Sequence, residues 1–435
     1  MQQKNIFSYF ILLIIVCMLI FIFHRFISQK TPFVYYSESD NSTYFKIQDY
    51  AYHIIITKNF WFYNYGNIYD VKFQIESLTK HIGKKTTYPM AIGITPIALI
   101  IWFPFAWVSI YSLSLSYTLW VSFSLLTLYS GFLLIAIDFY ENKKPPFILI
   151  LLIFVTLFST SHFLGLALGQ TSIFSSGLII HLMRIINKSD KKGKVDTFFL
   201  FLILFASGIK PVYSIIAFGI LLIYKKWREA FTSTLTMFLI LALITPFLTF
   251  DWISSYLNLL KMYSSGEFPI FYEWAVVPNT KTIFRSAFKD IIGDKIANSI
   301  SNYVTLFTYL FVIGCSITKT NTNQFKLLNI FQKTTKEQAI AILIGSYLLF
   351  APFANPCEDF LFLILLITSV ITKKFPKLTF SGGIIFAFLV FLIMSQSFLY
   401  YRNFLWLLWL IKATIIFLMI YFFRFEYSNN FMTRS

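Results

Sequence analysis

Charged residues are scarce in this chain of 435 residues, because only 13% of its positions hold Asp, Glu, Lys or Arg. Hydrophobic residues account for 57%, and the mean hydropathy is +0.70. No polar stretch beyond the first loop is long enough for a separate soluble domain. A chain with so little charge cannot stay folded in water as a globule, so the composition predicts an integral membrane protein with many spanning helices.

Cysteine is also scarce. The three cysteines, Cys17, Cys315 and Cys357, offer neither a disulfide framework nor the spacing of a metal site. The five histidines show no ligand spacing, and the chain has no Gly-rich nucleotide-binding loop and no catalytic triad motif. The sequence therefore predicts a protein without a cofactor, with a divalent metal left as an open alternative.

Long hydrophobic runs are what the chain has in place of charge. They predict an all-α polytopic membrane protein, a bundle of about 11–13 transmembrane helices in which residues 1–435 form one domain. The two longest polar segments, 29–88 and 250–296, are expected to be external loops. The runs fall near 6–28, 90–110, 113–137, 146–164, 171–187, 197–224, 230–249, 297–318, 338–353, 360–372, 379–396 and 405–423.

The net charge of +17 suggests nucleic acid only at first sight, because Lys and Arg gather in short loops between the runs. Under the positive-inside rule most of these loops are cytoplasmic, so the expected partners are membrane lipids and no nucleic acid. Twelve of the 19 acidic residues then lie in external segments. A functional site is therefore expected on the face away from the cytoplasm.

Lys210-Pro211 interrupts an apolar run in its middle. Proline removes a backbone donor and breaks helices, so two half-helices are expected to meet there. This break would also place the basic loops at 143–144 and 188–194 inside the cell, as the orientation rule requires. A lysine within an apolar run is either a functional residue or one whose long side chain reaches the interface.

The loop 29–88 concentrates acidic residues, with five of the 19 in the whole chain. The spacing of apolar residues from Tyr44 to Thr57 predicts an amphipathic helix lying in the membrane interface. Asp40 would then be either the cap of this helix or a functional carboxylate. Asp49 would lie on the polar face of the same helix, where it is either solvated or functional.

Further polar residues stand at turns and near the expected membrane edges. Gln170 follows a glycine inside an apolar run. It is either part of a loop that breaks a helix or a binding residue, because an amide at membrane depth needs hydrogen-bond partners. Tyr69 lies in an expected turn. In the second loop, Asn279 precedes Arg285, whose guanidinium suits a phosphate but is equally compatible with a plain surface role. Glu358 begins a late helix, where an acid also favours the helix dipole.

The order of these features resembles the polyprenyl-phosphate-sugar-dependent glycosyltransferases of the GT-C superfamily, in particular the bacterial glycosyltransferase family 87. That family includes mannosyltransferases that use polyprenyl-phosphate mannose. The likeness spans most of the chain, although Met90 stands where a second proline is usual and the late loop lacks the usual aromatic and histidine. The matching positions are Asp40 or Asp49, Tyr44, Gly66 to Tyr69, Tyr88-Pro89, Gly169-Gln170, Lys210-Pro211, Asn279, Arg285 and the loop from Ala351 to Asp359.

The resemblance implies an inverting membrane glycosyltransferase on the external face of a bacterial inner membrane. It would move a mannose-like hexose or a pentose from a polyprenyl-phosphate sugar donor to a glycan or glycolipid acceptor. Asp40, with Asp49 in reserve, would act as general base, while Arg285 and Lys210 would stabilise the leaving phosphate. The substrate-binding candidates are Tyr44, Tyr69, Gln170, Lys210, Asn279, Arg285 and Glu358.

A transporter or flippase for lipid-linked or small solutes is the main alternative, since many helices and an intramembrane Lys210 suit it as well. That class predicts internal symmetry and short loops on both faces, whereas this chain has no visible repeat and about 60 residues in its first loop. An envelope polysaccharide polymerase or ligase is a third class. Resemblance to those enzymes would place the large loop late in the chain.

Overall fold

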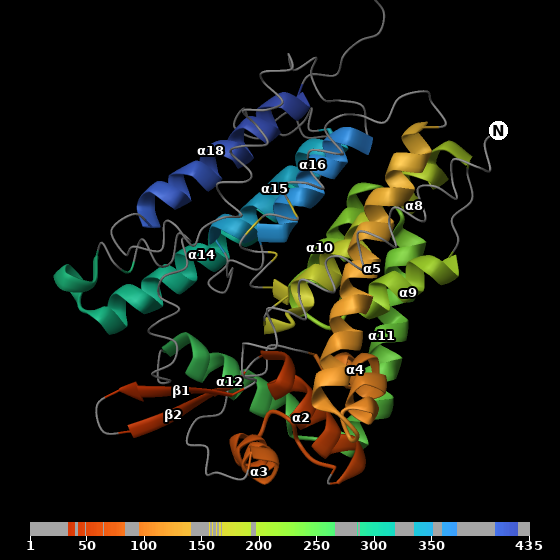
Figure 1. Cartoon of the computed structure of the whole chain (residues 1–435). Coiled ribbons are helices and arrows are strands. Elements are labelled where there is room, and N and C mark those ends of the chain that lie inside the picture. The colour runs from red at the N-terminus through yellow and green to blue at the C-terminus, as the bar shows by residue number, and fades with distance from the viewer. Residues whose placement is uncertain are drawn as a thin grey trace, which may run out of the picture.

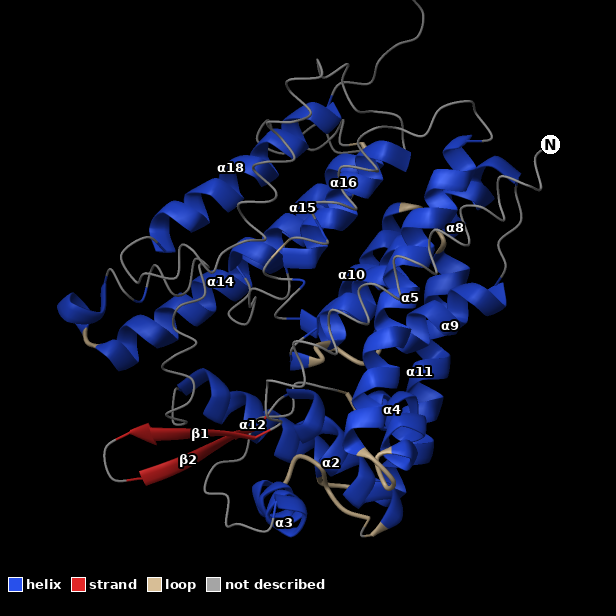
Figure 2. Ribbon diagram, in the orientation of Figure 1, coloured by secondary structure: helices blue, strands red, loops and turns tan. Residues whose placement is uncertain are grey.

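Helices occupy nearly all of the described chain and follow the apolar runs of the sequence (Figures 1 and 2). The runs near 6–28 and 379–396, and most of 146–164, lie outside the described residues. The computed structural model describes residues 34–39, 42–47, 49–63, 65–82, 95–140, 156, 159, 162, 165–166, 168–192, 197–265, 285, 288–317, 335–350, 359–371 and 405–424.

One bundle of helices comes from the first half of the chain, and α8 lies at its centre because it contacts α5, α9 and α10 (Figure 1). The helices are rich in Leu, Ile and Phe, and their buried faces supply most of the core. The bounds are α4 Ile97–Val108, α5 Leu113–Tyr140, α8 Thr171–Lys192, α9 Thr197–Ser207, α10 Pro211–Ile223 and α11 Trp227–Leu248.

A second layer of helices comes from the C-terminal part and packs on the first layer through α15 and α14 on α10 and through α16 on α8. Within this layer, Lys412 of α18 donates to Asp359 at 2.7 Å, and both side chains are completely buried. The pair fixes α18 against the start of α16. The bounds are α14 Asp294–Ile317, α15 Lys336–Phe350, α16 Leu361–Ile371 and α18 Leu405–Arg424.

The polar loops of the sequence fold into short elements at one end of the bundle (Figure 1). One of them is an antiparallel hairpin in which Val34 pairs with Ile47 and Ser39 with Ser42. The hairpin and the helices α3 and α12 were not expected from the sequence. The bounds are β1 Val34–Ser39, β2 Ser42–Ile47, α2 Asp49–Phe62, α3 Val71–Ile82 and α12 Trp252–Ser265.

The prediction of an interfacial amphipathic helix over Tyr44–Thr57 is wrong in two respects. Tyr44 belongs to strand β2, and the helix begins only at Asp49. Moreover, α2 has no polar face turned to solvent along most of its length, since nine of its 14 residues are buried. It packs against α3 and α4 and therefore belongs to the core of this end of the molecule.

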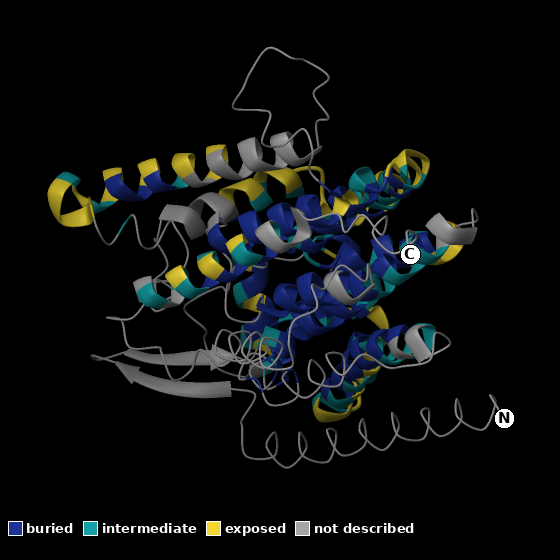
Figure 3. Ribbon diagram, turned by 90° about the horizontal axis from the view of Figure 1, so that it is seen from above, coloured by how far each residue is buried: buried dark blue, intermediate teal, exposed yellow. Residues whose placement is uncertain are grey.

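Among the helices of the described ranges, two are long and apolar enough to cross a membrane, Leu113–Ile135 in α5 and Trp227–Leu248 in α11. Only 17% of the apolar window of α11 is buried, and Phe231 and Leu243 on it are 70% and 72% exposed. In water such a surface would be unfavourable, whereas lipid tails would cover it at no cost. Figure 3 shows buried residues gathered in the middle of the molecule and exposed ones on outlying helices. The structure therefore agrees with a helical membrane protein, and the count of about 11–13 spans stays a prediction.

Candidate active site

The N-terminus of α2 meets the helix break at Gly169-Gln170, although the two lie far apart in the sequence. Asp49 is the first residue of α2, and the side-chain amide of Gln170 donates a hydrogen bond to its Oδ2. Gln170 is buried and immediately precedes α8. Two residues singled out from the sequence as base and sugar ligand are thus in direct contact, and Asp49 is not the simply solvated residue that the helix pattern suggested.

Glycine at position 169 is what permits this contact. Its φ of +62° lies in the left-handed region, and a Cβ there would stand 2.5 Å from the Cβ of Tyr50. The backbone is also held from the other side, because Trp120 Nε1 donates to the Gly169 carbonyl at 2.9 Å. The break predicted at Gly169-Gln170 is confirmed, and only a glycine allows α2 to approach it so closely.

The predicted break at Lys210-Pro211 is confirmed as well. The helix α9 ends at Ser207, Lys210 has extended backbone angles (φ −128°, ψ 122°), and Pro211 is the first residue of α10. Thr95, just before α4, holds this break by donating its backbone N–H to the Ile209 carbonyl at 3.2 Å. The two half-helices that the sequence indicated are therefore α9 and α10.

Three helix N-termini converge at these contacts. Asp49 begins α2, Gln170 precedes α8 and Lys210 precedes α10. Asp49 touches Gln170, and burial together with the charge of Lys210 lowers the pKa of His53 on α2. Each helix N-terminus carries a partial positive charge, which favours a negative group close to it.

Aromatic rings wall this junction on the side of α4 and α5. Tyr50 stacks on Trp102 with ring centroids 5.5 Å apart, and Trp102 lies 4.9 Å from Trp120. Tyr117 meets Tyr50 edge-on at 5.3 Å, and the Tyr50 hydroxyl is 2.5 Å from Ser116 Oγ. These completely buried rings fix α2 rigidly, which keeps the carboxylate of Asp49 in one place.

Tyr69 lies in the turn before α3, as expected, but it packs against α12. Its ring centroid is 4.8 Å from that of Tyr256 and 5.9 Å from that of Trp252, and burial raises the pKa of its hydroxyl well above the usual range. Asn67 in the same turn ties this region to α12, since its side-chain amide donates to Ser255 Oγ at 2.8 Å. Tyr69 therefore connects the first and second polar loops.

Arg285 is committed to an acidic partner. Its guanidinium donates two hydrogen bonds to Asp294 at the start of α14, at 2.6 and 2.5 Å, and this pairing lowers the pKa of Asp294. The sequence left open a phosphate-binding role and a plain surface role for Arg285, and the structure shows it in a forked ion pair. Among the other predicted site residues, Tyr44 lies in β2, and Asp40, Asn279 and Glu358 lie outside the described residues.

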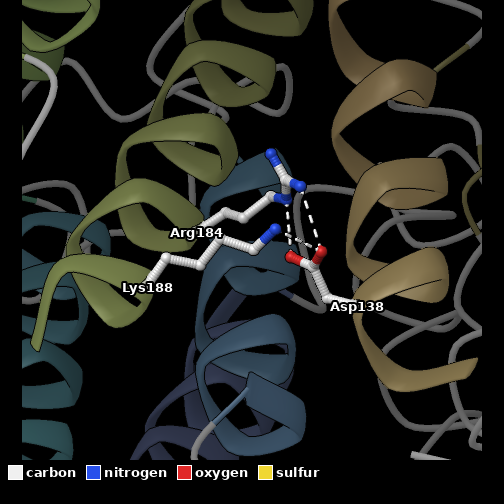
Figure 4. Close-up of polar contacts among 3 residues, drawn as sticks. All are labelled: Asp138, Arg184 and Lys188. Atoms are coloured by element: carbon white, nitrogen blue, oxygen red, sulfur yellow. Dashed lines mark hydrogen bonds and ion pairs between the residues drawn. The ribbon is translucent and has the colours of Figure 1, made fainter. Parts of the chain in front are cut away.

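A second charged cluster joins α5 to α8 (Figure 4). Asp138 accepts hydrogen bonds from Arg184 at 2.6 and 3.0 Å, and it also pairs with Lys188 at 2.6 Å. Figure 4 shows both cations reaching from α8 toward the one carboxylate on α5. The cluster secures the far half of α8, so the helix that carries Gln170 at its N-terminal end is held along its length. In the described part of the chain, no group of three or more His, Cys, Asp or Glu residues could hold a metal ion.

The sequence reasoning missed His53 and the pair of Asp359 with Lys412. His53 follows Asp49 by four residues, which is one helical turn, and that spacing was the available signal. Lys412 stands inside an apolar run, which by the argument applied to Lys210 should have marked it as a residue with a specific partner.

Comparison with known protein families gives a match over the part of the chain that contains Gln170 and Lys210. Residues 95–282 match the model of glycosyltransferase family 87. The resemblance drawn from the motif order is thereby confirmed over this region, which includes Gln170 and Lys210. This part of the chain is therefore similar to a family of glycosyltransferases. Neither the curated proteins nor the solved structures contain a match to the chain.

Proposed function

We propose that the protein transfers a sugar from a polyprenyl-phosphate donor to a lipid-linked or envelope glycan acceptor, with inversion at the anomeric carbon. The observation that carries the proposal is the contact of the Asp49 carboxylate with Gln170 at the start of α8, inside the region that matches the glycosyltransferase family. The reaction needs a base, because the acceptor hydroxyl must lose a proton, and it needs positive charge, because a phosphate leaves.

In this mechanism Asp49 accepts the proton of the acceptor hydroxyl as general base. The acceptor oxygen forms a bond to the anomeric carbon, and the bond from that carbon to the phosphate oxygen breaks. The electron pair departs with the phosphate, and polyprenyl phosphate is released. The amide of Gln170 orients the carboxylate of Asp49 by donating a hydrogen bond to Oδ2.

The leaving phosphate is stabilised by Lys210 and by the N-termini of α8 and α10. Each helix N-terminus contributes roughly 0.3–1 kcal/mol toward an anion near it, and more where water is excluded. The proposal does not require Arg285, because Asp294 already occupies its guanidinium fork. The active site would face outward, on the same side as the first polar loop.

Asp49 is preferred to Asp40 as the base because of its contact with Gln170, and the test compares the two directly. Purified protein in lipid nanodiscs is supplied with polyprenyl-phosphate mannose carrying labelled mannose and with a membrane glycolipid extract. Asp49→Asn should lower transfer by a factor of about 10²–10⁴, the usual contribution of a general base. Asp40→Asn should leave at least half of the activity.

Asp70→Asn is the matched control from the same loop. Asp70 is exposed and accepts a hydrogen bond from the Lys72 backbone N–H at 2.9 Å, at the start of α3. This variant should transfer sugar at the native rate. Full activity of Asp49→Asn, with loss in Asp40→Asn, would move the base to Asp40. Movement of labelled lipid across the membrane without any sugar transfer would favour a flippase instead.

A further inference from the structure

Two lysines meet over one tyrosine ring near the ends of α2 and α3. The ammonium of Lys58 on α2 lies 5.9 Å from the centroid of the Tyr63 ring, and that of Lys80 on α3 lies 4.4 Å from it. His81 meets the same ring edge-on, with centroids 5.8 Å apart. Tyr63 itself is 49% exposed, so these four residues, the Tyr63 patch, form an open surface that is both cationic and aromatic.

The positive charge of the Tyr63 patch has no counter-charge in the described part of the chain. Neither Lys58 nor Lys80 forms an ion pair there, unlike Arg285. Lys58 is partly buried, and the hydrogen bond that it donates to the Ser109 carbonyl is long, at 3.5 Å. Burial lowers its pKa, because a cation that leaves water without a partner is unfavourable. An anion bound in the patch would offset that cost.

The helix dipole accounts for only one of the two lysines. Lys80 stands in the last turn of α3, where a cation is favoured, but the last turn of α2 contains no basic residue. Lys58 therefore shares the ring with another cation without this benefit. The pKa of His81 is lowered to about 4 by burial and by the charges of the two lysines, so its ring is neutral and the patch carries the charge of two ammonium groups.

Contacts from residues 58–65 reach the ends of both helices that are long and apolar enough to cross a membrane. Lys58 Nζ touches the turn at Ser109, just before the apolar span of α5 begins at Leu113. The ring of Tyr65 lies 5.4 Å from that of Phe247, the last residue but one of α11. With α5 and α11 in a membrane, the Tyr63 patch therefore lies at the depth of the lipid headgroups.

Exposed aromatic rings accompany the lysines at this depth. Trp107 and Tyr111 stand on either side of Ser109 in the chain, are 52% and 76% exposed, and meet edge-on with centroids 6.2 Å apart. Such rings have an apolar body and a polar tip, which suits the boundary between acyl chains and water. A free anion would use the lysines alone, whereas a lipid with a charged headgroup uses the lysines and the rings together.

We propose that the Tyr63 patch binds the phosphate of an anionic phospholipid, with Lys58 and Lys80 as its ligands and the exposed rings beside the upper part of the acyl chains. The inference goes beyond sugar transfer and does not depend on it, because the lipid is a component of the surrounding membrane. It assigns a function to lysines that the order of sequence motifs leaves unused.

The experiment counts lipids bound to the full-length protein by native mass spectrometry. The protein, in a neutral detergent, is titrated with phosphatidylglycerol, and with zwitterionic phosphatidylcholine for comparison. The native protein should bind phosphatidylglycerol more tightly. Lys58→Met and Lys80→Met should each weaken that binding about fivefold, the usual contribution of one lysine facing an anionic lipid, and leave phosphatidylcholine binding unchanged. Lys58→Arg keeps the charge and should stay within about twofold of native.

Lys72→Met is the matched control. Lys72 is exposed on the same helix as Lys80, but it makes no contact with the Tyr63 ring and no ion pair in the described part of the chain. The substitution removes the same charge, so it should leave the binding of phosphatidylglycerol unchanged. Thermal unfolding without added lipid checks that each variant is folded. Because Lys80 is exposed, Lys80→Met tests the patch even if replacement of the partly buried Lys58 unfolds the protein.

Three results would overturn the assignment. One is a native protein that binds both phospholipids equally. Another is an equal loss in Lys72→Met and Lys80→Met, which would reduce the effect to general surface charge. The third is displacement of phosphatidylglycerol by millimolar inorganic phosphate, which would make the ligand a free anion. Retention of the lipid in phosphate, together with loss confined to the Lys58 and Lys80 variants, would support the headgroup site.

Discussion

Replacing Gly169 by alanine should damage the candidate site through the backbone alone. The added Cβ would lie 2.5 Å from Cβ of Tyr50 and 3.1 Å from the Tyr117 ring, whereas ordinary contacts between carbon atoms are about 3.5–4.0 Å. Since Tyr50 is itself enclosed by aromatic rings, α2 must shift by about 0.5–1 Å for the methyl group to fit. The same shift moves Asp49 relative to Gln170.

Two free-energy terms add in this variant. The left-handed backbone of Gly169 costs a residue with a Cβ about 1–2 kcal/mol, and overpacking at a rigid contact typically costs about 1–3 kcal/mol more. The free energy of unfolding should therefore fall by about 2–5 kcal/mol. A displacement of about 1 Å at a reacting group can lower the rate about 10²-fold, so sugar transfer should fall at least tenfold in the protein that remains folded.

Gly293→Ala provides the control for the backbone term. Its φ of +79° is also left-handed, but no atom lies within 4 Å of the position that a Cβ would take. This variant should lose only about 1–2 kcal/mol and keep its activity. Thermal unfolding and transfer rates are measured on both variants in the same nanodiscs. Equal effects of the two substitutions on activity would refute the view that close approach of α2 to the Gly169 break builds the site.

Two ion pairs give further predictions. Lys412→Met should lower the free energy of unfolding by about 3–5 kcal/mol, because it leaves the Asp359 carboxylate buried without its cation. Adding Asp359→Leu should recover most of that loss. If thermal unfolding shows that the losses of the two substitutions simply add, the two residues do not pair directly. Asp294→Asn should lower the midpoint of unfolding at pH 7, because Arg285 holds the pKa of Asp294 below its ordinary 3.8. The carboxylate stabilises the fold above that value and loses its effect as the pH falls through the lowered pKa, so native and variant midpoints should converge in acid. Equal midpoints at pH 7 would show that the pair does not stabilise the fold.

The two helix breaks could be predicted from the sequence because their causes are local. Proline at 211 has no backbone N–H to donate, so it ends one helix and begins the next. Glycine at 169 tolerates a left-handed backbone because it has no Cβ. Such effects depend on the residue itself and hardly on its neighbours in space. The positions of Gln170 and Lys210 at helix starts followed from them directly.

The first polar loop could not be predicted in the same way. The spacing of Tyr44, Ile47, Ala51 and Ile54 fits one side of a helix, yet the first two belong to a strand. Residues 42–47 are rich in Thr, Tyr, Phe and Ile, which suit a strand only when a partner such as 34–39 is available to pair with it. Pairing is a property of two segments, and the helical pattern of one segment concealed it.

The polar contacts of the site were equally out of reach of sequence reasoning. Nothing near Asp49 in the chain identifies Gln170 as its partner, since 121 residues separate them. Likewise, Asp359 gains its cation from a residue 53 positions later in the chain. Each contact follows from how helices pack, which a single sequence records only indirectly.

The convergence of three helix starts has a consequence for how the protein is made. A ribosome delivers Asp49 first, Gln170 much later and Lys210 later still, and the segments enter the membrane in that order. Until α10 has been inserted, the growing chain holds an aspartate at the start of α2 without the lysine and helix end that would face it. The candidate site can therefore be completed only after about half of the chain has been synthesised, and any truncated product ending before Pro211 would lack the start of α10.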